Sequence, residues 1–357
     1  MQVFRPALLL AGCWLAVGAC SSQPTAQISA VSASVPDKFK LTAGSCAPEG
    51  YWATIQSGFF SGPQGGGFPV PAGHTLEGSW GTSGTVWAVG KKMQPVPEHL
   101  ELLWFSYTEN KFYKGDFSLP QARLRTLLAQ GTWNVAKEKP AVYTEFTVCV
   151  LPKGAAVVWL TGGNQVLVGR FQGHEAVVSA TEFTRYYGAV DRAGMVQETR
   201  KEMPPEVQAQ IKAGTISTRQ WDEYLKVCPW QVAFNVPFTL TRYSFHGLNA
   251  ERFSNAASHD DLAGYRQFLL GPAPKAVPRQ LSLYGQAEHG AHYVVRVQAF
   301  DEVEIQAAFQ ALQAASPGSP ITLLFSLDKP LQKATLTLQN EAQAIPLPKS
   351  RVQIIAY

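Results

Sequence analysis

Alternation of apolar and polar residues predicts short strands along most of the chain. Residues 99–107 and 111–117 are rich in apolar side chains and are separated by Glu109-Asn110, a spacing that predicts a β-hairpin. Pro237 lies within a strand expected at residues 230–245, and it predicts a bulge or a sheet edge there, because proline cannot donate a backbone hydrogen bond. Turns containing Gly, Pro or Asn separate the strands, a pattern typical of antiparallel sheet. Further strands are expected at residues 51–60, 142–151, 155–160, 165–171 and 230–245.

Apolar residues at helical intervals predict a few short helices. The first follows Ser118 and Gln121, which have the spacing of a capping box, and Gly131 is expected to end it. Other helices are expected at residues 204–213, 217–227, 258–270 and 301–315. Strands outnumber helices, so the chain is expected to be rich in β-structure.

Residues 271–278 (GPAPKAVP) combine Gly with Pro and are expected to be a linker. The sequence therefore predicts an α+β, β-rich protein with two folded domains. Residues 46–271 are expected to form a sandwich-like main domain of antiparallel sheet with a few short helices. Residues 278–357 are expected to form a small C-terminal two-layer α+β module. Its strands are expected at residues 280–284, 293–300, 321–327, 333–338 and 352–357.

The first residues have the pattern of a bacterial lipoprotein export signal. Arg5 precedes an apolar stretch at residues 7–18, which is shorter than the roughly 20 residues needed to cross a bilayer. The stretch ends in small residues followed directly by Cys20, which is the pattern of a lipobox. We therefore predict a signal peptide at residues 1–19 and lipidation of Cys20, where several acyl chains give stable anchoring. A plain secretory signal that happens to contain a cysteine is the alternative.

Residues 20–45 are expected to be a flexible tether. They are rich in Ser, Ala, Gln and Thr, and such a stretch buries too little apolar surface to offset its ordering entropy. Ser21 follows the lipidated cysteine, and in lipoproteins of this kind an Asp there commonly causes retention in the inner membrane. We therefore expect the protein on the periplasmic face of the outer membrane.

Composition narrows the classes of partner. The formal net charge is only +4 and Lys and Arg do not cluster, which argues against nucleic acid as a partner. Cys13 lies in the predicted signal peptide and Cys20 is the predicted lipidation site, which leaves Cys46, Cys149 and Cys228. The spacing of these three matches no zinc pattern. If a disulfide forms in an oxidising compartment, Cys46–Cys228 is the expected pair, because both residues lie at segment edges. No metal and no cofactor are expected.

A search for catalytic motifs finds neither a Gly-x-Ser-x-Gly elbow nor a His-Glu-x-x-His helix. Aromatic residues beside glycine-rich loops are the stronger candidates for function. Exposed aromatic side chains are suited to contact with a protein partner or to stacking on sugar, whereas buried ones only pack the core. Both alternatives stay open for Phe59, Phe60, Phe68, Trp80 and Trp87.

Three short runs occur in a fixed order along the chain. They are HLELLWFSY at residues 99–107 with Leu119-Pro120 after it, LPKGAAVVW at residues 151–159, and the helical stretch at residues 211–221. In this order, and with the lipobox, they resemble a family of proteobacterial lipoproteins catalogued as a domain of unknown function. The resemblance covers residues 46–256. Many members look like immunity partners of type VI secretion effectors, especially phospholipases, so the resemblance implies a binding role.

Two functions of different classes follow from these expectations. The first is an outer-membrane-anchored immunity lipoprotein that binds a secreted lipase-type effector and neutralises it. The second is an envelope lipoprotein that binds peptidoglycan or sugar and has a structural role. No enzymatic activity is expected. A hydrolase is the remaining alternative, because the catalytic carboxylates of glycosidases are also scattered in sequence.

Overall fold

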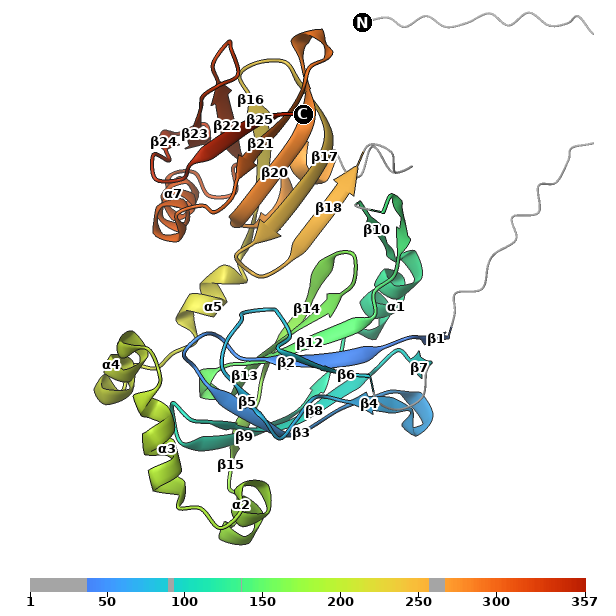
Figure 1. Cartoon of the computed structure of the whole chain (residues 1–357), viewed down its shortest axis with the longest axis vertical. Helices are drawn as coiled ribbons and strands as arrows, with labels where there is room; N and C mark the ends of the chain where they lie inside the picture. Colours follow the sequence, from blue (N-terminus) through green and yellow to red (C-terminus); the bar gives the residue numbers. More distant parts are fainter. Residues whose placement is uncertain (1–36, 89–92, 136, 257–266) are drawn as a thin grey trace, which may run out of the picture. The chain divides into compact units, whose positions relative to one another are not determined.

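Strands dominate the structure, a computed structural model that describes residues 37–88, 93–135, 137–256 and 267–357. Within these ranges the longest sheet has ten strands, antiparallel throughout except between β2 and β12 (Figure 1). Its strands, in spatial order, are β25 (Val352–Ala356), β21 (His292–Val297), β20 (Pro278–Ala287), β17 (Phe238–Gly247), β18 (Arg252–Ala256), β14 (Gln165–Gln172), β13 (Ala155–Thr161), β12 (Glu145–Val150), β2 (Thr42–Cys46) and β6 (Thr85–Trp87).

Two further sheets pack against this one. The first consists of β15 (His174–Ala176), β9 (Lys111–Ser118), β8 (His99–Ser106), β3 (Ala53–Ser61) and β4 (Gly67–Pro69), with β5 (Thr75–Leu76) paired to β3. The second consists of β19 (Ala273–Ala276), β16 (Val227–Phe234), β22 (Ile321–Leu327), β23 (Ala334–Gln339) and β24 (Ala344–Pro346). Two small ribbons pair β1 (Lys38–Phe39) with β7 (Gln94–Pro95) and β10 (Thr132–Asn134) with β11 (Lys139–Ala141).

Short helices connect and cover the strands. The α-helices with described bounds are α1 (Gln121–Gln130), α2 (Ala180–Tyr187), α3 (Arg192–Lys201), α4 (Pro205–Ala213), α5 (Arg219–Tyr224) and α7 (Glu302–Ala315). Single 3-10 turns lie at η1 (Pro63–Gly65), η2 (Pro152–Gly154) and η3 (Glu288–Gly290). The β-rich α+β fold expected from the sequence is thus confirmed.

Aromatic side chains fill the space between the first two sheets. Phe60 of β3 packs against Phe146 of β12 with ring centroids 4.9 Å apart, and Phe68 of β4 packs against both. Trp104 of β8 is fully buried in the same cluster. Two sheets with interdigitated inner faces form a β-sandwich, and burial of these rings stabilises it.

A second hydrophobic core lies among β16, β22, β17, β20 and helix α7. Trp230 of β16 contacts Phe245 of β17 and Phe309 of α7, with ring centroids 5.8 and 6.1 Å apart. Asp301 caps α7, because its side chain accepts a hydrogen bond from the backbone N–H of Glu304. The helix thereby presents Ile305, together with Phe309, to this core.

The hairpin expected at Glu109-Asn110 is confirmed: β8 and β9 pair from His99↔Ser118 to Ser106↔Lys111. The start of α1 differs from the expectation. Pro120 is its N-cap and no side chain caps it, so Ser118 and Gln121 do not form a capping box. Gly131 does end the helix, with a φ of 65° and its N–H bonded to the carbonyl of Leu127.

Two expectations around the C-terminal half were wrong. The strand expected at residues 230–245 is two strands, β16 and β17, which belong to different sheets with Pro237 in the connection between them. The linker expected at residues 271–278 contains β19, which pairs with β16. Alternating Pro and Ala in this segment is compatible with an edge strand, because an edge leaves one side of the backbone unpaired. The division of the chain into two domains stays a prediction.

Several expectations fall outside the described residues. They concern the signal peptide, Cys20 and the tether up to residue 36, and also the first part of the helix expected at residues 258–270, of which residues 267–270 are described and helical. The described end of the expected tether, residues 37–45, was wrongly predicted to be flexible: it contains β1 and most of β2, and β2 pairs with β6 and β12 and buries Ala43 and Ser45. Among the described residues, no helix has both the length and the apolar character needed to cross a membrane.

Candidate functional site

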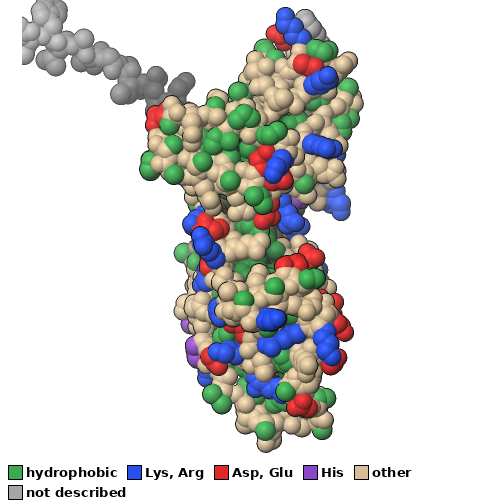
Figure 2. Space-filling view, turned by 90° about the vertical axis from the view of Figure 1, so that its left-hand side faces the viewer, with side chains coloured by type: hydrophobic (Ala, Val, Ile, Leu, Met, Phe, Trp, Pro, Cys, Tyr) green, Lys and Arg blue, Asp and Glu red, His purple; other side chains and the backbone are tan. Residues whose placement is uncertain are grey.

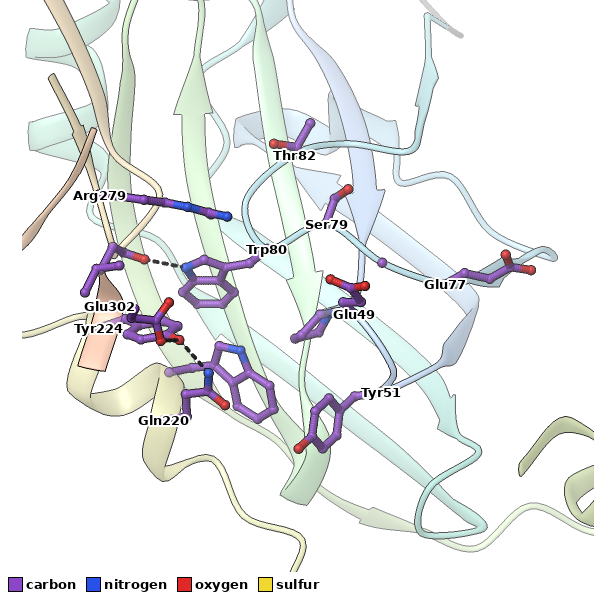
Figure 3. Close-up of a pocket in the computed structure, with 14 residues that line it drawn as sticks. Glu49, Tyr51, Glu77, Ser79, Trp80, Thr82, Gln220, Tyr224, Arg279 and Glu302 are labelled. Carbon is purple, nitrogen blue, oxygen red and sulfur yellow. Dashed lines mark hydrogen bonds between the residues drawn. The ribbon is translucent and has the colours of Figure 1, made fainter. Parts of the chain in front are cut away.

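A cavity of about 780 Å³ is the strongest candidate for a binding site. Segments that are far apart in the sequence contribute to it: the connections β2–β3 and β5–β6, helix α5, the turn after β17, the start of β20 and the first residue of α7. Figure 3 shows Trp80 between residues from the two halves of the chain. The lining residues are Pro48, Glu49, Tyr51, Glu77, Gly78, Ser79, Trp80, Thr82, Gln220, Trp221, Tyr224, Leu248, Arg279 and Glu302.

Aromatic rings form the inner wall of this cavity. The ring of Tyr51 meets that of Trp221 edge-on, with centroids 4.8 Å apart and planes at 88°. The ring of Trp80 lies 6.3 Å from that of Tyr224. Tyr51 and Trp80 are half-buried, whereas Trp221 and Tyr224 are buried. The wall therefore presents ring edges and faces held in place by packing, and Trp221 and Tyr224 do so from one side of helix α5.

Three successive backbone carbonyls fix the position of Trp80. The indole N–H of Trp80 donates to the carbonyl of Leu248 at 2.8 Å, and that of Trp159 donates to Asn249 at 2.9 Å. The side-chain amide of Gln165 donates to the carbonyl of Ala250 at 2.7 Å and to Gly81 at 2.7 Å. These bonds hold the loop that carries Trp80 against the turn after β17, so the cavity is rigid on this side.

Gly81 allows this close approach. Its φ is 69°, a conformation that residues with a side chain rarely adopt, and a Cβ there would lie 2.2 Å from the Cβ of Ala250. Any larger residue at this position would separate the loop from the turn. The glycine is therefore needed to place Trp80.

A hydrogen-bonded group links α5 to α7 at the edge of the cavity. The hydroxyl of Tyr224 donates to the carboxylate of Glu302, and the side-chain amide of Gln220 donates to the Tyr224 oxygen (Figure 3). Burial, and then donation to Glu302, raises the pKa of Tyr224. The phenol therefore stays protonated at neutral pH and orients the carboxylate, which lies at the positive N-terminal end of α7.

The charges around the cavity are unequal. Glu49, Glu77 and Glu302 contribute three carboxylates, and Arg279 contributes one guanidinium, so the lining carries a formal charge of −2. All four side chains are exposed to solvent. Within the described residues, Glu49 and Glu77 form no hydrogen bond or ion pair. An aromatic wall with uncompensated carboxylates can bind a ligand that carries positive charge or several hydroxyl groups.

The five aromatic residues identified as candidates from the sequence differ in burial and position in the structure. Phe60 and Phe68 are buried in the sandwich core, so contact of these two with a partner is excluded by their inward orientation. Phe59 is 40% exposed on the opposite face of β3, and Trp87 is half-buried in the edge strand β6. Trp80 is the residue of this group that lines the cavity.

Sequence reasoning missed the remaining cavity residues. Tyr51, Glu49 and Arg279 lie in no recognisable motif, and they meet only because distant segments fold together. One local signal is present in the sequence: Trp221 and Tyr224 are three residues apart, a spacing that places both on one face of a helix.

The cysteine side chains do not form the expected disulfide. Cys46, Cys149 and Cys228 are buried free thiols. Cys46 in β2 is the register partner of Cys149 in β12, whereas Cys228 belongs to the hydrophobic core around α7. The expected pair Cys46–Cys228 was wrong for this reason: parallel pairing of β2 with β12 brings Cys46 to Cys149. Within the described part of the chain, no three His, Cys, Asp or Glu residues are grouped to hold a metal.

Fold and cavity together define a β-rich α+β protein with an aromatic-walled cavity. Residues 22–218 match the family described as "Protein of unknown function (DUF2931)", and the chain belongs to this family. No curated protein and no solved structure matches the chain. The family match ends before α5, so one wall of the cavity lies within the matched residues, whereas the wall with Gln220, Tyr224, Arg279 and Glu302 lies beyond them.

Proposed function

We propose that this protein is an envelope lipoprotein that acts by binding, and that its partner is a secreted lipase-type toxin, which it neutralises. The partner class comes from the family resemblance and the anchor from the sequence pattern that ends in Cys20. The type VI secretion system is the proposed route of delivery, and the periplasmic face of the outer membrane is the proposed site of action.

The observation that carries the binding role is the cavity beside Trp80. Trp and Tyr are the residue types that contribute most to binding free energy at protein interfaces. The hydrogen bonds of Trp80 and Trp159 to the turn after β17 fix the wall in advance, so little conformational entropy is lost when a partner enters. A preformed cavity of this kind fits a protruding loop of a toxin.

The proposed anchor and tether support the same role. A lipid-anchored domain on a flexible segment stays near the membrane, where a lipase-type toxin finds its substrate. Tethering raises the effective concentration of the binding site at that surface, and capture is then faster than in the bulk periplasm.

Sugar binding is the second candidate, and the aromatic wall is the observation that favours it. Tryptophan rings beside carboxylates and amides, such as Trp80 with Glu49 and Gln220, are suited to stacking on a sugar ring while its hydroxyls donate hydrogen bonds. In this case the protein is an envelope lipoprotein that binds peptidoglycan.

The proposed function is tested by deleting the gene and producing the lipase-type toxin encoded beside it in the periplasm. We expect the deletion strain to lose viability and a plasmid copy of the lipoprotein to restore it. A Cys20→Ala copy, which lacks the proposed lipid attachment site, is expected to protect less well. Full viability of the deletion strain in the presence of an active toxin contradicts the proposal.

A further inference from the structure

We propose that the cavity binds the cationic side chain of a lysine or arginine presented by a protein partner. This inference deepens the proposed function, and it rests on that function, since it names the chemistry that the cavity recognises. It is carried by the combination of an aromatic wall, an excess of carboxylates and a cavity of about 780 Å³.

Charge complementarity is the first argument. The cavity lining contains three carboxylates and only one guanidinium. Glu302 already accepts a hydrogen bond from Tyr224, which leaves further acceptor sites on the same carboxylate. Glu49 and Glu77 have no partner among the residues that the structure describes, so an arriving ammonium or guanidinium would be the first group to compensate them.

The excess of negative charge is local. On the face drawn in Figure 2, acidic and basic side chains are intermixed and neither sign dominates. The chain as a whole has a formal charge of +4. The protein as a whole therefore does not attract cations, whereas the cavity lining, with a charge of −2, attracts them locally.

The aromatic wall is the second argument. A cation near the face of a Trp or Tyr ring is attracted by the electrons of the ring, and the attraction is larger where water is excluded. Trp80 and Tyr51 are half-buried, so part of each ring faces the cavity while the rest is packed. Arg279 extends toward Trp80 in Figure 3.

Size is the third argument. Binding cavities for drug-sized ligands are about 300–1,000 Å³. A cavity of about 780 Å³ exceeds the space that one extended side chain fills, and it leaves room for the neighbouring backbone of the loop that presents the side chain. A free amino acid would leave much of it empty.

The test measures binding of short blocked peptides to the full-length protein. The probes are acetyl-Gly-Lys-Gly-amide and acetyl-Gly-Arg-Gly-amide, with acetyl-Gly-norleucine-Gly-amide as the neutral comparison and chitotriose as the sugar. Binding is followed through the indole N–H resonances of tryptophan in the magnetic resonance spectrum, which report Trp80 directly. We expect both cationic peptides to bind, more weakly as salt is raised, and the norleucine peptide and chitotriose not to bind.

Charge-removing variants test the residues. The double variant Glu49→Gln with Glu77→Gln keeps size and polarity, and we expect its affinity for the cationic peptides to fall about tenfold. Glu101→Gln is the matched control: Glu101 is an exposed carboxylate on β8 away from the cavity, and its loss is expected to leave binding unchanged. Equal binding of the norleucine peptide, binding of chitotriose instead, binding of no probe, or equal loss in both variants overturns the inference.

The same variants separate this inference from the proposed function. If the double variant protects cells from the toxin as fully as the unaltered protein and no cationic peptide binds, the inference fails and neutralisation stands. If the cationic peptides bind as expected but the lipoprotein does not protect cells, the site chemistry stands and the neutralisation role fails.

Discussion

The indole rings of Trp80 and Trp159 meet edge-on, with centroids 4.8 Å apart and planes at 88°. Each donates its N–H to one of two successive carbonyls in the turn after β17, so the two rings act together on one short segment. Trp159 is fully buried and Trp80 is half-buried. Trp80 is therefore both a packing residue of the fold and a surface of the cavity.

Replacement of Trp80 by Phe tests the packing role. Phe keeps an aromatic ring but has no N–H, so the buried carbonyl of Leu248 loses its donor, which costs about 1–3 kcal/mol. We expect the free energy of unfolding in urea to fall by this amount. Trp87→Phe is the control, since Trp87 is also half-buried but its indole N–H makes no hydrogen bond with described residues. Equal stability of the two variants would show that the bond to Leu248 contributes nothing.

A buried lysine gives the protein a pH-dependent stability. Lys275 is 2% exposed, and its ammonium donates to the carbonyl of Trp230 and, at 3.1 Å, to that of Ala273. Burial lowers the pKa of Lys275 from 10.5 to about 7. Below pH 7 the side chain is charged in both the folded and the unfolded state, and the cost of burying it is fully present. As pH rises above 7, the folded protein releases the proton first and becomes more stable.

We therefore expect the free energy of unfolding to increase by about 1–2 kcal/mol between pH 7 and pH 8.5, at about 1.4 kcal/mol per pKa unit. Burial raises the pKa of the neighbouring Cys228 from 9.0 to about 11, which opposes this increase once the thiol ionises in the unfolded state, and with an ordinary pKa of 9.0 that happens mostly above this window. The measurement is urea unfolding across the range. Lys275→Met is expected to lack the increase, and an increase of the same size in this variant would assign it to another group.

Features of the fold could be predicted from the sequence where they depend on residues close together in the chain. The β8–β9 hairpin and Gly131 at the end of α1 depend on neighbouring residues, so the alternation pattern and one glycine were sufficient. The separation of β16 from β17 at Pro237 depends on which sheet each strand joins, and pairing between distant strands leaves no local trace.

The cavity was hidden for the same reason. Glu49, Trp80 and Glu302 come from three connections or helix ends that are adjacent only after folding. The sequence identified Trp80 as a candidate through its glycine-rich surroundings. It also identified Phe60 and Phe68, which have similar surroundings but face the core, because a glycine-rich neighbourhood does not indicate the direction of a side chain.

Thiol reactivity distinguishes the observed cysteine arrangement from the expected disulfide. Cys46, Cys149 and Cys228 are buried, and burial raises the pKa of Cys149 and Cys228, so few reactive thiolates exist at neutral pH. We expect iodoacetamide to leave all three unmodified in the folded protein and to modify all three in urea without reductant, as seen by mass spectrometry. Modification of Cys149 alone in urea would show that Cys46 and Cys228 are joined in a disulfide.

The bond between Tyr224 and Glu302 is expected to stabilise the contact between α5 and α7. Tyr224→Phe removes the donor and Glu302→Gln removes the charge of the acceptor, and each change is expected to lower the free energy of unfolding by about 1 kcal/mol. In the double variant the losses should not add, because they remove the same bond, so the double loss stays near that of one single variant and the coupling energy is about 1 kcal/mol.

The control for this cycle pairs Tyr224→Phe with Glu101→Gln, which lie in separate parts of the fold and should give additive losses. Urea unfolding of the single and double variants provides the measurement. Because Tyr224 also orients the Glu302 carboxylate at the cavity, Tyr224→Phe is expected to weaken binding of the lysine peptide as well. Additive losses for Tyr224 and Glu302 would mean that the hydrogen bond contributes no stability and that the two helices are held by packing alone.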